Sequence, residues 1–90
     1  MFDKLFKVVE ITNDFGLHMR SANKISQIAV NSKKKIWLIK NDKKVDASDI
    51  FDILTIFCPK GTKLTIQAEE NADICILNKI AELIKNGFGE

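Results

Sequence analysis

Residues 16–22 read Gly-Leu-His-Met-Arg-Ser-Ala, and this stretch joins an apolar segment to an amphipathic one. The turn-forming residues Asn13 and Asp14 come just before it. Beyond it, small and apolar residues recur at helical spacing and predict a helix over residues 19–30. The recurring residues are Met19, Ala22, Ile25, Ile28, Ala29 and Ser32. The only histidine of the chain, His18, therefore stands at the N-terminus of a predicted helix.

The position of His18 favours anion chemistry. A helix N-terminus has unpaired backbone N–H groups and a partial positive charge, which together bind anions. A histidine there is well placed to hold a phosphoryl group on its ring, and Arg20 can add a forked, charge-assisted contact to the same oxygens. The pattern alone leaves open the alternative that His18 is a surface or capping residue, because helix termini that attract anions are common.

The remaining chain reads as a short series of alternating elements. Period-2 patterns predict strands at residues 5–11, 35–39, 44–47 and 63–68. Helical patterns predict a short helix from residue 50, capped by Ser48 or Asp49, and a last helix from Asn71 or Asp73 to Gly87. Four short strands and three helices predict a two-layer sandwich of helices on a sheet.

Composition indicates one small globular domain over residues 1–90. The net charge of +2 is too small to indicate nucleic acid binding, and Lys33, Lys34 and Lys35 are expected to form a solvated turn. The sequence contains no signal-peptide or membrane-spanning pattern, so we expect a cytoplasmic protein. Cys58 and Cys75 lack metal-ligand spacing and are expected to be buried, reduced thiols.

The whole sequence resembles the HPr family, the histidine-containing phosphocarriers of the bacterial sugar phosphotransferase system. The resemblance rests on Gly16-Leu17-His18-x-Arg20, on Asp49-Ile50-Phe51 and on Lys60-Gly61-Thr62. The family motif usually reads Gly-(Leu/Ile)-His-x-Arg-Pro-Ala, and Ser21 stands here in place of the proline. We expect this serine to leave the turn freer and to offer an N–H and a hydroxyl to a phosphate. The regulatory serine of the family falls on Asp49.

The resemblance implies an α+β fold of order βαββαβα. It is an open-faced, two-layer sandwich with a four-stranded antiparallel sheet and all three helices on one face. Ile36 and Leu38 would then point toward the helices, while Trp37 and Ile39 would lie on the open face. Trp37 and Ile39 are interpreted either as a contact patch or as the scattered apolar residues that surfaces normally carry.

The resemblance also implies a phosphoryl relay. His18 would accept a phosphoryl group on Nδ1 from phosphorylated enzyme I and pass it to the IIA components of sugar permeases. The charge would be stabilised by the Arg20 side chain and the backbone N–H groups of Met19, Arg20 and Ser21. No metal or other cofactor is expected. The protein would be a carrier on which enzyme I acts, and not a stand-alone enzyme.

The expected partners are enzyme I, the IIA proteins and a transcription regulator, bound by a monomer without nucleic acid or membrane insertion. Contact would use Met19, Lys24, Ile50 and Phe51, rimmed by Arg20 and Lys60. Met19, Ile50 and Phe51 have the alternative role of filling the core.

Two other functions remain open from the sequence. One is a regulatory HPr-like binding protein with weak or no phosphoryl transfer, which Ser21 and Asp49 both favour. The other is an unrelated small interaction module in which His18 has no chemical role.

Overall fold

The computed structural model describes residues 5–90 and has the predicted order of strands and helices. The strands are β1 (Phe6–Glu10), β2 (Ile36–Lys40), β3 (Lys43–Asp46) and β4 (Lys63–Ala68), and the helices are α1 (Met19–Ala29), α2 (Ile50–Leu54) and α3 (Ile74–Lys85). Short 3-10 turns lie at Asn71–Asp73 and Gly87–Gly89. The four strands and α1 were each predicted to within one residue at either end.

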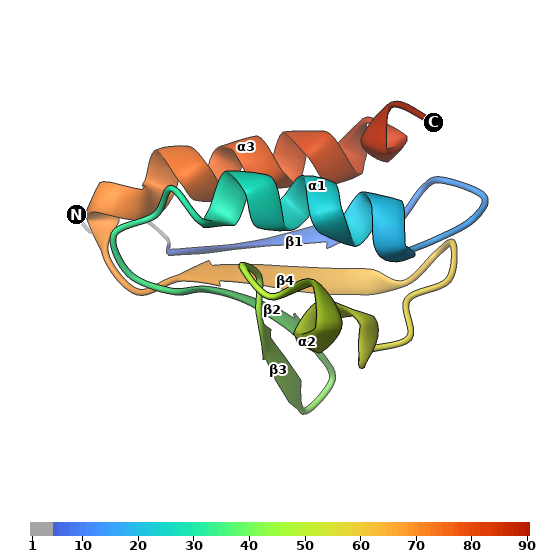
Figure 1. Ribbon diagram of the computed structural model, residues 1–90, viewed down its shortest axis with the longest axis horizontal. Helices are drawn as coiled ribbons and strands as arrows, with labels where there is room; N and C mark the ends of the chain where they lie inside the picture. The colour runs from blue at the N-terminus through green and yellow to red at the C-terminus, as the bar shows by residue number, and fades with distance from the viewer. Residues whose placement is uncertain (1–4) are drawn as a thin grey trace.

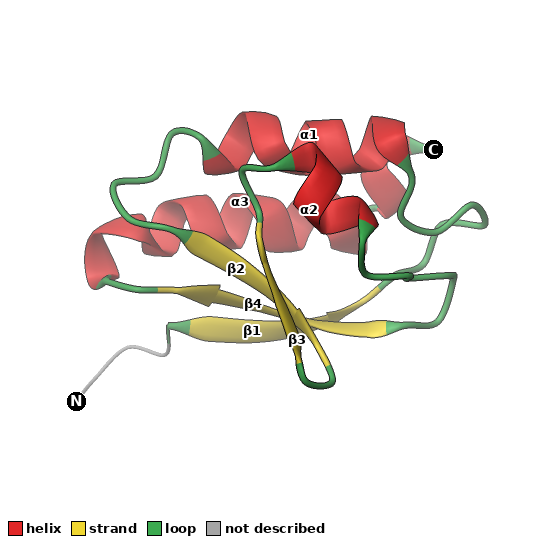
Figure 2. Cartoon of the chain, turned by 60° about the horizontal axis from the view of Figure 1, so that its bottom comes forward, coloured by secondary structure: helices red, strands yellow, loops and turns green. Residues whose placement is uncertain are grey.

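The strands form one antiparallel sheet in the order β1-β4-β2-β3. Figure 1 shows α1 and α3 side by side over this sheet, and Figure 2 shows sheet and helices as two separate layers. The expected open-faced sandwich, with three helices on one face, is therefore confirmed.

The register of the sheet explains which residues form the core. Leu38 pairs with Val45 on one side and Ile66 on the other, and all three are buried against the helices. Their neighbours Trp37 and Ile39 point to the open face, as predicted, but both are only half-exposed. Trp37 donates its Nε1–H to Glu69 at 2.8 Å, and the ammonium of Lys44 lies 4.7 Å from its ring. Polar side chains thus shield part of this tryptophan from solvent.

The chain after α3 folds back as a hook, residues 86–90. Gly87, Phe88 and Gly89 all have positive φ angles, between 60° and 76°. Phe88 adopts this uncommon conformation for a residue with a side chain, and that side chain is 1% exposed in the core. The Lys24 ammonium donates to the Phe88 carbonyl at 2.6 Å. The hook therefore returns the chain to the end of the molecule at which α1 begins (Figure 1).

The two cysteines differ in burial. Cys58 is buried, and burial raises the pKa of its thiol. The prediction that Cys75 is also buried was wrong, because Cys75 is exposed on α3. It precedes the buried Leu77 by two residues, and two residues turn a helix by about 200°, so the two side chains point in opposite directions. Within residues 5–90, no helix has both the length and the apolar character needed to cross a membrane.

Candidate functional site

The candidate site is the first turn of α1. His18 is the N-cap of this helix, with extended backbone angles of φ −136° and ψ −178°. Its carbonyl accepts the first helical hydrogen bond, from the Ala22 N–H at 2.8 Å. The backbone N–H groups of Met19, Arg20 and Ser21 precede that bond and have no acceptor within the helix. They give the end of the helix at His18 the polarity of an anion site.

A glycine brings the loop before His18 close to the segment after α2. Gly16 has φ +65°, and a Cβ atom there would lie 2.5 Å from the Cys58 carbonyl oxygen. The next residue, Leu17, donates its N–H to that same carbonyl at 2.9 Å. Any larger residue at position 16 would push the loop away. The glycine therefore fixes where His18 stands relative to the end of α2.

The side chain of Ser21 is bonded within the first turn of α1. Its side chain is buried, and its Oγ accepts a hydrogen bond from the His18 N–H at 2.8 Å. The same hydroxyl donates to the His18 carbonyl at 3.1 Å. The expectation that the Ser21 hydroxyl is free to reach a phosphate was wrong, because the hydroxyl is already bonded to the backbone of His18. Ser21 thus occupies the N3 position of a capping box, with His18 as its N-cap, where the family motif has proline.

Glu90 completes the site from the far end of the chain. Its Oε2 lies 2.6 Å from Nε2 of His18, and its Oε1 accepts from Nδ2 of Asn13 at 2.9 Å. The Glu90 side chain is 15% exposed and that of His18 31%. The hydrogen bond from Asn13 holds the pKa of the Glu90 carboxyl below its ordinary 4.5. Partial burial opposes this shift, whereas His18 and the charge of Arg20 add to it.

The contact with Glu90 bears on which ring nitrogen of His18 is available. A carboxylate accepts hydrogen bonds only, so it favours the tautomer of a neutral imidazole that carries its proton on Nε2. That tautomer leaves the lone pair on Nδ1. Sequence reasoning missed Glu90, although the two glycines that flank Phe88 were a visible sign of a reversal of the chain after α3.

Arg20 lies beside His18 at a hollow of about 560 Å³. The residues that line the hollow are Phe15, His18, Arg20, Lys24, Gly89 and Glu90. Phe15 meets the His18 ring edge to face, with 6.3 Å between ring centroids. Arg20 is exposed, whereas the ammonium of Lys24 is bonded to the hook. Lys60, expected at the rim, forms an exposed ion pair with Asp14 at 2.8 Å.

Asp49 is the N-cap of α2 and accepts hydrogen bonds from the N–H groups of Phe51 and Asp52, at 3.0 and 3.2 Å. Ser48 does not cap the helix, since its hydroxyl donates to Asp46 at 2.7 Å. Ile50 is half-buried and packs against the core, which agrees with its alternative role as a core residue.

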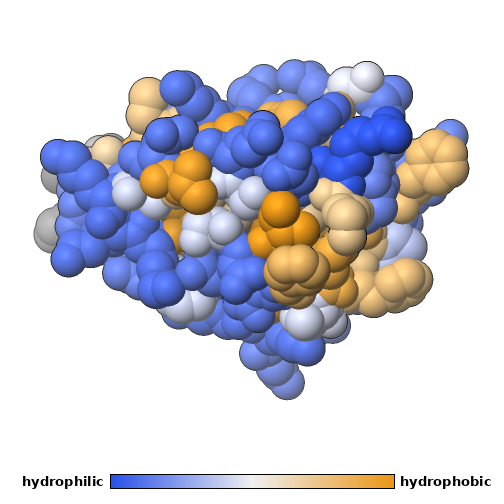
Figure 3. All heavy atoms as spheres, in the orientation of Figure 1, coloured by the Kyte–Doolittle hydropathy of each residue, from blue (hydrophilic) through white to orange (hydrophobic). Residues whose placement is uncertain are grey.

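The other apolar candidates do not fill the core. Met19 is 61% exposed and Phe51 75% exposed. Two further phenylalanines that the sequence did not single out, Phe15 and Phe57, are 81% and 77% exposed. We call Phe15, Met19, Phe51 and Phe57 the apolar rim. Figure 3 shows hydrophobic surface over α2 and toward the end of the molecule at which α1 begins.

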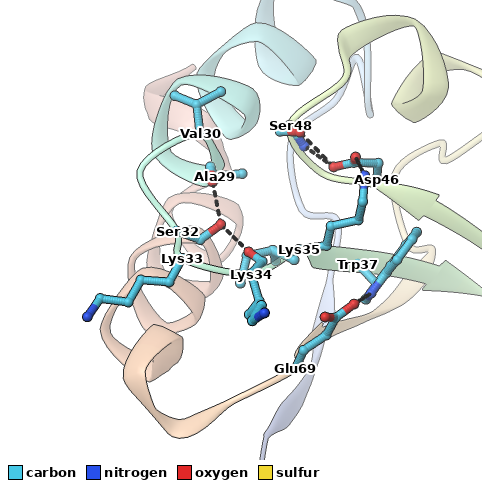
Figure 4. A pocket seen from close by; sticks show the side chains of 11 residues that line it. Ala29, Val30, Ser32, Lys33, Lys34, Lys35, Trp37, Asp46, Ser48 and Glu69 are labelled. Atoms are coloured by element: carbon cyan, nitrogen blue, oxygen red, sulfur yellow. Dashed lines mark hydrogen bonds and ion pairs between the residues drawn. The ribbon is translucent and has the colours of Figure 1, made fainter.

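A second hollow, of about 620 Å³, lies at the other end of α1, roughly 16 Å from His18 along the helix. Its hydroxyl and carboxylate groups already pair with other residues of the lining (Figure 4). Ser48 and Lys35 both donate to Asp46, and Ser32 donates to the carbonyls of Ala29 and Lys34. Such a self-paired surface offers a ligand few free groups, so the site at His18 is the stronger candidate.

The chain is similar to several known phosphocarrier proteins. Residues 6–86 match the family model described as PTS HPr component phosphorylation site. The chain is 32% identical over 82 residues to phosphocarrier protein HPr of Neisseria meningitidis, covering 91% of this chain and 92% of that protein. It is 28% identical over 87 residues to phosphocarrier protein NPr of Shewanella violacea, covering 97% and 96%. The crystal structure of HPr-C-His from Thermoanaerobacter tengcongensis superposes with a TM-score of 0.87 at 32% identity, covering 94% and 96%.

Proposed function

The chain belongs to the HPr family of phosphotransferase-system phosphocarriers, and from that premise we propose that it carries a phosphoryl group on Nδ1 of His18. The donor would be phosphorylated enzyme I, and the acceptors would be IIA components of sugar permeases. The observation that carries the proposal is the contact between His18 Nε2 and Glu90, because it favours the neutral tautomer with its proton on Nε2 and a lone pair on Nδ1 at the N-terminus of α1.

The transfer consists of one bond exchange. The Nδ1 lone pair attacks phosphorus, an N–P bond forms, and the bond from phosphorus to the donor breaks with its electron pair leaving on the donor. The Nε2 proton stays in its hydrogen bond to Glu90 throughout. Transfer to IIA is the same exchange in the opposite direction, with His18 as the leaving group.

Charge stabilisation would supply the rate. Transition states of phosphoryl transfer are largely dissociative, so positioning and electrostatics contribute more than covalent assistance. The N–H groups of Met19, Arg20 and Ser21 and the guanidinium of Arg20 would face the phosphoryl oxygens. Glu90 would contribute from the Nε2 side of the ring, where its negative charge is separated from the phosphoryl group.

The apolar rim supports a protein partner at this site. Four large side chains, 61–81% exposed, are costly to leave in water and are typical of the core of an interface. Lys40 lies 5.6 Å from the Phe57 ring, which adds positive charge to this surface. We propose that a monomer in the cytoplasm presents this surface to enzyme I and the IIA proteins.

The test is phosphorylation by purified enzyme I and phosphoenolpyruvate, read by phosphorus NMR. We expect one acid-labile signal at the shift of Nδ1-phosphohistidine, which His18→Ala abolishes while the fold persists. Labelling at another residue would contradict the proposal. So would the absence of labelling under conditions in which a phosphocarrier known to be active is labelled.

The second candidate is a regulatory HPr-like protein with weak or no phosphoryl transfer. The observation in its favour is Asp49, which keeps a fixed negative charge at the N-terminus of α2, the position of the family's regulatory serine. The same assay separates the two candidates, since the regulatory protein would bind partners while it remained unlabelled.

A further inference from the structure

We propose that Asn13 is a positioning residue that acts through Glu90 to set which ring nitrogen of His18 carries the proton. The inference rests on the proposed function in one respect, because only the tautomer with a free Nδ1 can accept a phosphoryl group. In the sequence, Asn13 indicates a turn and nothing more.

The geometry is a continuous chain of hydrogen bonds. Asn13 Nδ2 donates to Glu90 Oε1 at 2.9 Å, and Glu90 Oε2 lies 2.6 Å from His18 Nε2. Asn13 is buried, at 6% exposure, so its bond to Glu90 is shielded from competing water. Asn13 and Glu90 are 77 positions apart in sequence, so the contact depends on the hook.

The orientation of the Asn13 amide is fixed by its neighbours. Its Nδ2 also donates to the Gly16 carbonyl at 2.8 Å, so both of its neighbours are acceptors. A flipped amide would turn Oδ1 against a carbonyl and a carboxylate, and both contacts would be repulsive. Oδ1 is buried and has no hydrogen-bond partner within residues 5–90. The arrangement leaves that oxygen unpaired. In return, the two hydrogens on Asn13 Nδ2 are both donated, one to the Gly16 carbonyl and one to the Glu90 carboxylate.

Because Asn13 Nδ2 is a fixed donor, it determines whether the side chain at position 90 offers His18 Nε2 a hydrogen-bond acceptor or a donor. A carboxylate has acceptors on both sides, so the native pair favours a proton on His18 Nε2. A glutamine has one acceptor and one donor, and Asn13 Nδ2 would bind the acceptor. The amide NH₂ would then face His18 Nε2 and shift the ring proton to Nδ1, the nucleophilic nitrogen.

The experiment is to determine the His18 tautomer by ¹⁵N NMR at a pH at which the ring is neutral. We expect the Nε2–H form to predominate in the natural protein and the Nδ1–H form to predominate in Glu90→Gln. Adding Asn13→Ala to Glu90→Gln frees the glutamine to flip and present its oxygen. The Nε2–H to Nδ1–H ratio should then recover by roughly two- to tenfold, the range that one hydrogen bond supports.

A second variant separates the loss of the donor from the loss of side-chain volume. Asn13→Asp has nearly the same shape and, like Asn13→Ala, loses the bond to the Gly16 carbonyl. In the Glu90→Gln background its carboxylate would bind the glutamine NH₂ and turn the oxygen toward His18. It should restore the Nε2–H form at least as fully as Asn13→Ala. The matched control is Asn31→Ala in the same background, because the Asn31 side chain donates to the Gln27 carbonyl at the far end of α1 from His18. This control should leave the Nδ1–H form predominant.

The outcomes are distinct for the two proposals. A tautomer ratio in Glu90→Gln that neither Asn13 variant moves would overturn the role of Asn13 and leave it as a residue of the turn. So would a predominant Nε2–H form in Glu90→Gln itself. The NMR measurement needs no partner, whereas the proposed function fails if the natural protein is not labelled. In the transfer assay, Glu90→Gln should slow labelling and the added Asn13 variants should partly restore it.

Discussion

Nε2 of His18 lies 2.6 Å from Oε2 of Glu90, although 72 positions separate the two residues in sequence. The contact depends on the hook after α3, which is anchored by the buried Phe88 ring and by the bond from Lys24 to the Phe88 carbonyl. The candidate site therefore joins the loop before α1 to the hook after α3. Substitutions in the hook should therefore alter the protonation and reactivity of the His18 ring, although they leave residues 16–22 unchanged.

Replacing Arg20 by alanine should slow phosphoryl transfer in both directions by roughly ten- to a hundredfold, the effect of losing charge-assisted contacts to the phosphoryl oxygens. Stability should barely change, because Arg20 is exposed. Arg20→Lys should recover part of the rate, since an ammonium lacks the planar fork. Rapid-quench labelling measures the rates, and the exposed Lys33→Ala is the control for loss of one positive charge. Equal rates for Arg20→Ala and the natural protein would leave Arg20 as a solvated helix residue.

Ser21→Pro should change the transfer rate by less than about tenfold, which is roughly 1.4 kcal/mol of barrier. Proline stiffens the first turn of a helix but removes the Oγ that accepts from the His18 N–H. Ser21→Ala loses this bond without the stiffening, so it should lower the free energy of unfolding by about 1–2 kcal/mol. Labelling kinetics and urea unfolding test both variants. A much larger gain in rate with proline would favour the regulatory function.

Two Phe→Ala variants should differ sharply in stability. Phe88→Ala removes a ring that is 1% exposed and should lower the free energy of unfolding by about 3–5 kcal/mol. Phe51→Ala removes a ring that is 75% exposed and should change it by less than about 0.5 kcal/mol, while weakening binding to enzyme I. Urea unfolding and a binding titration separate the two effects. Similar losses of stability in both variants would show that Phe51 packs in the core after all.

Sequence patterns predicted the elements because each has a strong local signal. The alternation of Ile36, Trp37 and Leu38 gave the two faces of β2, and Gly16 marked the turn before α1. What the sequence did not predict was long-range. The approach of Glu90 to His18 depends on three consecutive positive φ angles, which no periodicity reveals.

Side-chain roles near the site were harder to predict than the elements. The Ser21 hydroxyl was expected to be open to a phosphate. Ser21 is buried, however, and its hydroxyl bonds to the His18 backbone. Cys75 was expected to be buried because its neighbours are apolar, yet its position on α3 turns it to solvent. Both errors arose because burial depends on which face of a helix packs, and a few residues of local sequence do not determine this.

Acid should weaken the fold partly through Asp46. Partial burial tends to raise the pKa of this carboxyl, but hydrogen bonds from Lys35 and Ser48 outweigh burial and hold the pKa below its ordinary 3.8. Because the folded pKa is depressed, the stabilisation is complete above the unfolded pKa and is lost as the pH falls through the folded value. Asp46→Asn should therefore lower the free energy of unfolding near pH 7, with the deficit shrinking toward pH 2. Asp42→Asn, in an exposed turn, is the control for urea unfolding. A deficit that does not vary with pH would contradict this role of Asp46.

Asp49→Ser should preserve the fold, because serine and aspartate cap helices about equally well, with a change within about 0.5 kcal/mol. Asp49→Ala should lower the free energy of unfolding by about 1 kcal/mol, through loss of the bonds to the N–H groups of Phe51 and Asp52. Removing the negative charge next to the exposed Phe51 should leave enzyme I binding unchanged or strengthen it modestly. A carboxylate has less charge and fewer acceptor oxygens than a phosphate, so Asp49 imitates a phosphorylated serine only in part.

Ser48 should remain unmodified in the natural protein, since its hydroxyl is bonded to Asp46 and does not cap α2. Incubation of the natural protein and Asp49→Ser with HPr kinase, beside titrations with enzyme I, tests these expectations together. The serine variant should be the better kinase substrate, because only there does a hydroxyl stand at the N-cap of α2. Efficient labelling of Ser48 in the natural protein would contradict this expectation, because a serine beside α2 would then still be open to regulation. Weaker enzyme I binding by a well-folded Asp49→Ser would show that the native carboxylate assists the contact, since the variant differs there only in charge and shape.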